Sequence, residues 1–133
     1  MHHTQSNLIE IKEKIKTKMH ELSLTEYNPK VIAVSKTFLE EDILPLIDYG
    51  HNEFGENKVQ EALNKWSSIK KRNKNLKLHM LGKLQTNKVK NAVEIFDYIH
   101  SLDSLKLANK LSDEINKKLN IIKIFIQINL GDE

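Results

Sequence analysis

The chain has 133 residues, of which 39% are hydrophobic and 29% charged, and these proportions are typical of one soluble globular domain. It contains no cysteine, which excludes disulfides, thiolate metal sites and a cysteine nucleophile, and no apolar stretch approaches the ~20 residues that cross a bilayer. The net charge of +3 rests on 20 Lys and one Arg, so the side chain best suited to reading phosphates and bases is nearly absent. We therefore expect a cytoplasmic protein that binds neither membrane nor nucleic acid.

The first thirty residues predict an amphipathic helix and a lead-in. Apolar side chains recur every three or four residues over 7–22, and Asn7 with Glu10 has the spacing of a capping box. Asn28 and Pro29 then break the helical pattern. We assign 1–28 to an N-terminal helix with its lead-in, inside a single domain that covers 1–133.

Five apolar segments alternate with helical patterns from residue 31 onward. The sequence predicts strands at 31–36, 51–56, 77–82, 98–103 and 121–130, and helices at 37–49, 57–71, 85–95 and 104–119. Capping boxes are expected at Thr37 with Glu40 and at Asn57 with Gln60. Strands that alternate with helices at intervals of roughly 20 to 25 residues indicate βαβ crossovers and a parallel sheet. The uninterrupted apolar runs of the first and fifth strands are typical of strands covered on both faces.

The predicted sheet is either doubly wound or part of a barrel. A doubly wound sheet normally carries a glycine-rich phosphate turn after its first strand, and residues 35–42 contain no glycine. A (β/α) barrel places its chemistry at the carboxyl ends of several strands, where Lys36, Glu56, Asn57 and Gly82 lie here. We therefore predict an α/β fold, a partial (β/α) TIM-type barrel of about five parallel strands with crossover helices.

Length indicates that this barrel is incomplete. A full barrel takes ~250 residues, whereas this sequence supplies five βα units over 31–133 and ends at 131–133, where the next crossover would begin. The C-terminal half of the barrel is then missing and the chain looks truncated. The first and fifth strands become open edges, and the exposed apolar fifth strand is an aggregation hazard.

Five segments resemble, in order and spacing, the pyridoxal phosphate homeostasis protein family, also called the proline synthetase co-transcribed homologues. They are VIAVSKTF, HNEFGENKVQEAL, LHMLGKLQTNKVK, IHSLDSLKLANKL and IQINLGDE, and together they span 31–133. The resemblance implies a single barrel of the kind found in the N-terminal domain of alanine racemase. It also implies binding of pyridoxal 5'-phosphate (PLP) without the second domain that racemases use.

The resemblance implies that two residues bind the cofactor. Lys36 would carry PLP as an imine, and apolar neighbours at a strand tip would lower the pKa of its amine by desolvation, which favours the neutral form that reacts. Asn57 would face the cofactor, although the same residue could simply cap a helix. Glu56 is expected to be a solvated strand-end carboxylate, and Gly82 either lets backbone approach the ligand or only ends a strand.

No catalytic residue and no metal site are predicted. His51 and His100 share no spacing with carboxylates that would hold a metal ion, and His79, in a strand, is more typical of a core or rim residue. Asn129 is a weaker candidate for the pocket. The resemblance places the family's phosphate cradle, and an arginine near the pyridine nitrogen, in the absent half of the barrel. Arg72 lies in a Lys-rich helix end and does not fit the latter role.

Three classes of function, and a fourth outcome without function, follow from these observations. The preferred one is a PLP carrier in PLP homeostasis that turns over no substrate, with apo-PLP enzymes as possible recipients and a complementary C-terminal fragment as a possible partner. The alternatives are a PLP-dependent racemase-like enzyme, which needs an acid and a base on opposite faces of the cofactor, and a non-binding remnant of a split gene. A nucleic-acid or interaction module with a Lys-rich surface is the third class.

Overall fold

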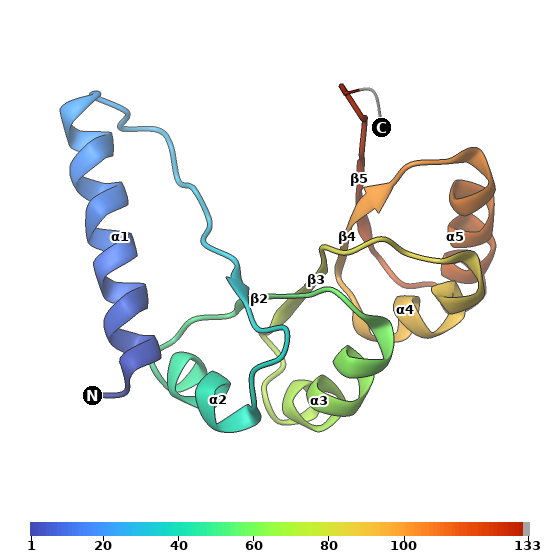
Figure 1. Ribbon diagram of the computed structural model, residues 1–133, viewed down its shortest axis with the longest axis horizontal. Helices are drawn as coiled ribbons and strands as arrows, with labels where there is room; N and C mark the ends of the chain where they lie inside the picture. The colour runs from blue at the N-terminus through green and yellow to red at the C-terminus, as the bar shows by residue number, and fades with distance from the viewer. Residues whose placement is uncertain (132–133) are drawn as a thin grey trace.

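The computed structural model describes residues 1–131 and shows an α/β fold with one five-stranded sheet (Figure 1). The predicted crossover start at 131–133 therefore lies almost wholly outside the described residues. The strands are β1 (Ala33–Val34), β2 (Glu53–Glu56), β3 (Lys77–Met80), β4 (Tyr98–Leu102) and β5 (Lys123–Ile126). The helices are α1 (His3–Glu21), α2 (Glu40–Asp48), α3 (Val59–Arg72), α4 (Val89–Ile95) and α5 (Leu105–Lys118), with a short 3₁₀ helix η1 (Thr86–Lys88) before α4.

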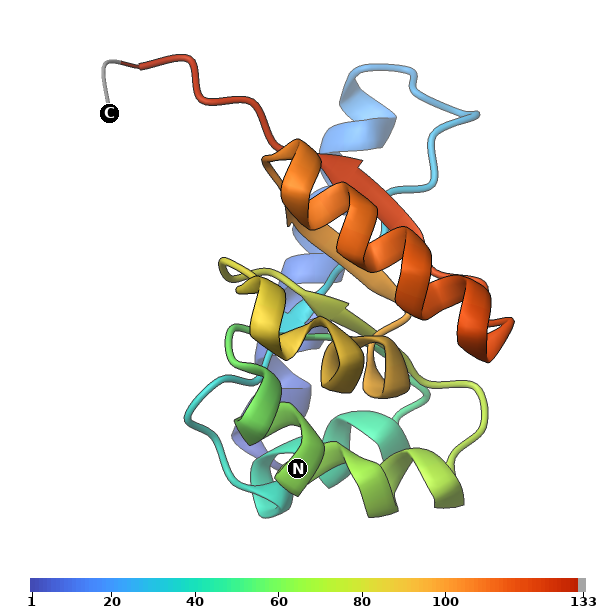
Figure 2. The same ribbon diagram turned by 90° about the vertical axis from the view of Figure 1, so that its right-hand side faces the viewer.

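Every strand pairs in parallel with the next strand of the chain, so the sheet order is β1-β2-β3-β4-β5. A doubly wound sheet reverses its strand order at a switch point, whereas a barrel does not. Helices α2 to α5 follow one another along one side of the curved sheet, and Figure 2 shows α3, α4 and α5 covering it from outside. The prediction of a partial barrel with five parallel strands is confirmed.

The hydrophobic core lies between the sheet and these outer helices. Phe54, Leu78 and Ile99 of the strands are fully buried and face Trp66 and the other apolar side chains of the helices. Phe54 and Trp66 pack with their ring centroids 4.9 Å apart. Since successive strand residues alternate between faces, the side chains between these core positions point to the concave side of the sheet. The outer face thus stabilises the fold, and the concave face is left for other roles.

Strands β1 and β5 are the two edges of the sheet, as expected for an incomplete barrel. The prediction that both are covered on both faces is wrong, because Val34 is 45% exposed and Ile126 is 73% exposed. An edge strand has a neighbour on one side only, and no element among residues 1–131 covers the concave side of either strand. Both strands are also shorter than predicted: the ladder covers two residues of 31–36 and four of 121–130.

The predicted capping boxes are wrong at all three helix starts. α1 begins earlier, at His3, and His2 caps it by accepting a hydrogen bond from the Thr4 amide. Leu39 precedes α2 and Lys58 precedes α3, and neither makes a side-chain cap. The Gln60 amide bonds Asn64 instead of reaching back to Asn57. A capping-box spacing in the sequence therefore does not fix where these helices begin. The predicted end of α2 at Tyr49 and Gly50 is confirmed, with Gly50 in the left-handed region at φ 97°.

Candidate cofactor-binding site

Lys36 lies at the carboxyl end of β1, where the sequence predicts it. The Ser35 amide still donates to the Gly55 carbonyl at 2.9 Å, so the ladder with β2 continues to the residue before Lys36. The Lys36 side chain itself is exposed to solvent. The expected desolvation of this amine is therefore absent, because the neighbouring Val34 is exposed as well and nothing among residues 1–131 covers that side of the strand.

A sharp turn carries Lys36 away from the strand. The Phe38 amide donates to the Ser35 carbonyl at 3.1 Å, which makes Lys36 and Thr37 the two central residues of a β-turn. Thr37 has φ 65°, a left-handed conformation that is rare for a β-branched residue. Its hydroxyl donates to the Lys36 carbonyl at 2.6 Å. The candidate lysine therefore lies on a defined turn, and its side chain is exposed to solvent.

Glu56 is fully buried, so the prediction of a solvated strand-end carboxylate is wrong. Its side chain points to α3, where it accepts from Trp66 Nε1 at 3.1 Å and from Lys65 Nζ at 3.1 Å. The Ser35 hydroxyl also donates to it in a short hydrogen bond. Burying a carboxylate is costly unless donors satisfy it, and these three groups do so. Sequence reasoning missed the arrangement because the donors come from α3 and from the residue after β1, which are distant in the sequence.

Glu61, on the first turn of α3, accepts a hydrogen bond from the Thr37 amide at 2.6 Å. That bond, and to a smaller extent the nearby Lys65 ammonium, hold the pKa of the Glu61 carboxyl below its usual value. Lys65 Nζ lies 3.2 Å from Glu61 and 2.6 Å from the Ser35 carbonyl. The residues on both sides of Lys36 are thus bonded to side chains of α3.

Asn57 follows β2 at the same edge of the sheet as Lys36. The register pairs Val34 with Gly55, and Lys36 and Asn57 each follow two residues later, beyond the carboxyl ends of β1 and β2. A side chain on Gly82 would come within 2.3 Å of the Asn57 carbonyl oxygen, so glycine there allows the two backbones to approach. Gly82 therefore allows close contact with the backbone of another protein segment, and the structure does not show it approaching a ligand. Within residues 1–131 the structure gives the Asn57 amide no hydrogen bond, and its cofactor role stays a prediction.

A cavity of about 340 Å³ opens beside Asn57. It lies beyond the carboxyl ends of β2 and β3, and its polar lining comes from the loops that follow these strands and the starts of the next helices. The polar residues in the lining are Asn57, Lys58, Gln60, Lys83, Gln85 and Lys88. Carboxyl ends of parallel strands are where α/β folds bind ligands, so this cavity extends the edge marked by Lys36.

The concave face carries a chain of polar and aromatic side chains that sequence reasoning missed. His79 lies 2.6 Å from Glu53 through Nε2 and 2.8 Å from His100 through Nδ1. The His79 ring stacks on Tyr98, and the His100 ring stacks on Phe125. Burial, with a smaller effect of His79, lowers the pKa of His100. The signal was present as positions on four parallel strands, β2 to β5, and it becomes visible only when the register is known.

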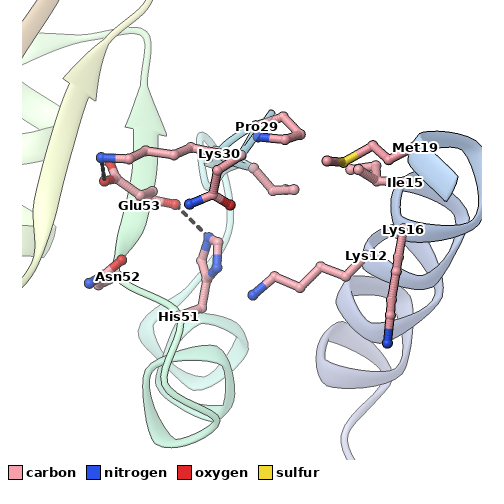
Figure 3. A pocket seen from close by; sticks show the side chains of 11 residues that line it. Lys12, Ile15, Lys16, Met19, Pro29, Lys30, His51, Asn52 and Glu53 are labelled. Atoms are coloured by element: carbon pink, nitrogen blue, oxygen red, sulfur yellow. Dashed lines mark hydrogen bonds and ion pairs between the residues drawn. The ribbon is translucent and has the colours of Figure 1, made fainter. Parts of the chain in front are cut away.

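A second cavity of about 570 Å³ lies between α1 and the amino ends of the first two strands (Figure 3). Lys12 and Lys16 reach it from α1, and Lys30, His51 and Glu53 line the opposite wall. His51 Nε2 bonds the Glu53 carbonyl at 2.7 Å, and burial lowers the pKa of His51. Because it opens at the amino ends of the strands, this cavity is separate from the edge that holds Lys36.

No group of three or more His, Cys, Asp or Glu side chains within residues 1–131 is arranged to hold a metal ion. None of the helices in this range is long and apolar enough to cross a membrane.

Comparison with known proteins gives close agreement with the motifs. No family model matches the chain. A curated protein of Pasteurella multocida (strain Pm70), named pyridoxal phosphate homeostasis protein, is 36% identical over 129 residues, which are 97% of this chain and 55% of that protein. The protein of the same name from Escherichia coli (strain K12) is 34% identical over 128 residues, 96% of this chain and 55% of that protein. The chain therefore spans about half the length of the curated relatives it matches.

Solved structures agree with these relatives. PipY of Synechococcus elongatus PCC7942, solved with PLP bound, is 35% identical with a TM-score of 0.74, over 87% of this chain and 55% of PipY. A protein of Bifidobacterium adolescentis has a TM-score of 0.86 at 22% identity, over 98% of this chain and 56% of its own, and supports the fold alone. The predicted resemblance is confirmed: over nearly its whole length this chain is similar to proteins named pyridoxal phosphate homeostasis protein.

Proposed function

We propose that this chain binds PLP covalently through Lys36 and takes part in PLP homeostasis as a carrier that turns over no substrate. The observation that carries the proposal is the position of Lys36: an exposed amine on a fixed turn at the carboxyl edge of a parallel barrel sheet. That edge is where barrels hold their ligands. Relatives of the chain are named for PLP homeostasis, and PipY was solved with PLP.

Attachment of PLP requires few functional groups at this edge. PLP supplies an aldehyde, and the neutral Nζ of Lys36 adds to its carbon with loss of one water to give the imine. Exposure of Lys36 leaves the amine accessible to PLP. We assign to the side-chain amide of Asn57 a hydrogen bond to the cofactor at this edge. In this proposal these two side chains bind the pyridine end of the cofactor.

The phosphate of PLP needs an anchor that we do not assign to any side chain of residues 1–131. Barrels commonly hold phosphate with the loops after strands 7 and 8. The chain spans about half of its relatives, so we propose that it is a single partial barrel domain, complemented by a C-terminal segment that supplies the remaining strands and this anchor. PLP binding by residues 1–133 alone is then weak and readily reversed.

A racemase-like enzyme is the alternative. It needs an acid and a base on opposite faces of the cofactor, and Lys36 could supply one of them, whereas the nearby Lys65 is bonded to Glu56, Glu61 and the Ser35 carbonyl. The relatives' printed names describe homeostasis, which favours a carrier. Racemisation of alanine that disappears in Lys36→Ala would support the enzyme instead. Apo-PLP enzymes as recipients and a cytoplasmic location belong to the same proposal.

Borohydride trapping tests the carrier function. The protein is mixed with PLP, the visible absorbance of the imine is recorded, and reduction is followed by peptide mass spectrometry. We expect the label to concentrate on Lys36 and to vanish from that peptide in Lys36→Ala. Lys90→Ala, which removes another exposed lysine, on α4, is the matched control and should keep the label. Label scattered over many lysines, or none, would contradict a carrier and indicate a non-binding remnant.

A further inference from the structure

We propose that Glu56, Glu61 and Lys65 form a clamp that fixes the backbone on both sides of Lys36 and so positions its amine for PLP. We call these three residues the Lys65 clamp. The inference rests on the proposed function, since it assigns a role to residues that support Lys36. None of the three would touch the cofactor, so we describe them as positioning residues.

The first part of the clamp holds the residue before Lys36. Lys65 Nζ donates to the Ser35 carbonyl at 2.6 Å, and the Ser35 hydroxyl donates to the buried Glu56 carboxylate. The same hydroxyl lies 3.2 Å from the Gly55 carbonyl. Both the backbone and the side chain of Ser35 are therefore fixed, and this residue is itself buried. Lys36 is therefore joined to a residue whose backbone and side chain are both held by hydrogen bonds.

The second part holds the residue after Lys36. Glu61 accepts from the Thr37 amide at 2.6 Å, and Thr37 occupies a left-handed conformation with φ 65°. Such a conformation is unfavourable in a non-glycine residue and persists where surrounding contacts enforce it. The Glu61 bond is a contact of this kind, because it satisfies the amide of the strained residue. The turn that presents Lys36 is thus maintained from α3.

Lys65 joins the two parts. Its ammonium has three N–H groups, and its three acceptors are the Ser35 carbonyl, Glu56 and Glu61. The side chain is 11% exposed and lies between two carboxylates. An amine that is charged and fully bonded is a poor nucleophile, so Lys65 does not compete for PLP although it lies next to the site. The arrangement separates a structural lysine from a reactive one.

A fixed Cα at Lys36 raises the reactivity of its amine toward PLP because the side chain then starts from one orientation. If the turn at 35–38 moved freely, the Lys36 amine would sample directions away from the carboxyl edge, and each productive encounter would cost conformational entropy. We therefore expect loss of the clamp to weaken PLP attachment at Lys36 about tenfold while other exposed lysines react as before.

Lys65→Met is the principal test, because it keeps the length of the side chain and removes the ammonium. Lys70→Met is the matched control: Lys70 lies on the same helix, is also largely buried, and bonds a backbone carbonyl (Ile95, 2.8 Å) and a carboxylate (Asp97, 2.7 Å). Asp97 precedes β4, at the amino ends of the strands, so Lys70 has no contact with the Lys36 turn. Both variants lose one lysine bonded in the same way.

Two readouts are compared in the full chain. The first is the apparent dissociation constant for PLP and the share of borohydride-trapped label on Lys36. The second is amide hydrogen exchange of the peptide covering 35–38, measured without PLP. For Lys65→Met we expect about tenfold weaker attachment at Lys36 and faster exchange at 36–38, and for Lys70→Met neither change.

Glu61→Ala keeps the test decisive if Lys65→Met fails to fold, because the Glu61 side chain is 29% exposed and its removal leaves Glu56 paired. It should speed exchange of the Thr37 amide and weaken attachment in the same direction. Attachment at Lys36 and exchange at 36–38 that match the unmodified chain in both variants would overturn the clamp and leave the carrier function intact. Absence of label on Lys36 in the unmodified chain would instead overturn the carrier function, and the exchange data would still judge the clamp.

Discussion

Thr37 combines an unfavourable backbone conformation with a position next to the proposed reactive lysine. Its φ of 65° is tolerated by glycine, whereas a β-branched side chain clashes with its own backbone there. Strain of this kind is concentrated at sites where a chain must present a side chain in one direction. The residue therefore links a local cost in stability to the orientation of Lys36.

Thr37→Gly should raise the free energy of unfolding by about 1 kcal/mol, because glycine adopts the left-handed region without steric cost. Urea denaturation of the two proteins measures the change. Thr25→Gly is the control: Thr25 lies in an exposed irregular segment and has no positive φ, so the same substitution should lower stability by increasing the entropy of the unfolded chain. An equal loss in both variants would show that Thr37 carries no strain.

His100 gives the fold a pH dependence whose sign can be worked out. Burial and the neighbouring His79 hold the pKa of His100 below its ordinary value of 6.5, so the unfolded chain binds a proton more readily than the folded one. The stability that neutral His100 contributes is therefore fully present above pH 6.5, and it is lost as the pH falls from 6.5 toward the lowered pKa. His51 contributes in the same direction.

We expect His100→Gln to flatten the dependence of stability on pH between about pH 7.5 and about pH 5.5, with a residual slope from His51. Urea midpoints across this range provide the measurement. His20→Gln, at an exposed histidine of α1, should leave the slope unchanged. An identical slope in the unmodified chain and in His100→Gln would contradict the assignment.

At the scale of elements, the sequence predicts all five strands and the helices between them, because hydrophobic periodicity and turn residues are local signals. The helix starts are less predictable. Asn57 with Gln60 has a capping spacing, yet α3 begins at Val59 and the Gln60 side chain bonds within the helix. The extents of β1 and β5 also depend on neighbours that a local pattern does not contain.

In the candidate site, too, local features could be predicted from the sequence and contacts between distant residues could not. Lys36 could be predicted, because a strand followed by a lysine is visible in the sequence and the family motifs mark it. The contacts that hold it could not, since Glu61 and Lys65 lie 24 and 30 residues away from the backbone groups that they bond. Glu56 was misjudged for the same reason: its burial depends on Trp66 and Lys65 of the following helix.

At the scale of the whole molecule, the open edge at β5 is the most exposed apolar feature of the described chain. Phe125, Ile126, Ile128 and Leu130 are all more than half exposed. A flat apolar edge with unpaired backbone groups is a template for pairing with another chain. The β5 edge therefore favours pairing either with the complementary segment of a complete barrel or with a second copy of this chain.

Ile126→Lys should reduce concentration-dependent self-association of the isolated chain, because a charge on an edge strand opposes pairing with a second copy. Sedimentation velocity over a concentration series measures the effect. Leu39→Lys places the same charge at another exposed apolar residue, before α2 and away from the edge, and should leave association unchanged. Equal association in Ile126→Lys and the unmodified chain would show that the β5 edge is not the contact.

The strand order β1-β2-β3-β4-β5 also bears on how the molecule is made. Each strand pairs with the strand of the next βα unit, so the register joins residues 19 to 25 positions apart and each pairing closes a loop of similar length. A ribosome that delivers the chain from its N-terminus releases each unit directly beside the edge on which it will pair. Folding can advance one unit at a time during synthesis, and the growing edge at every stage is the place where the next unit, or a separate complementary fragment, attaches.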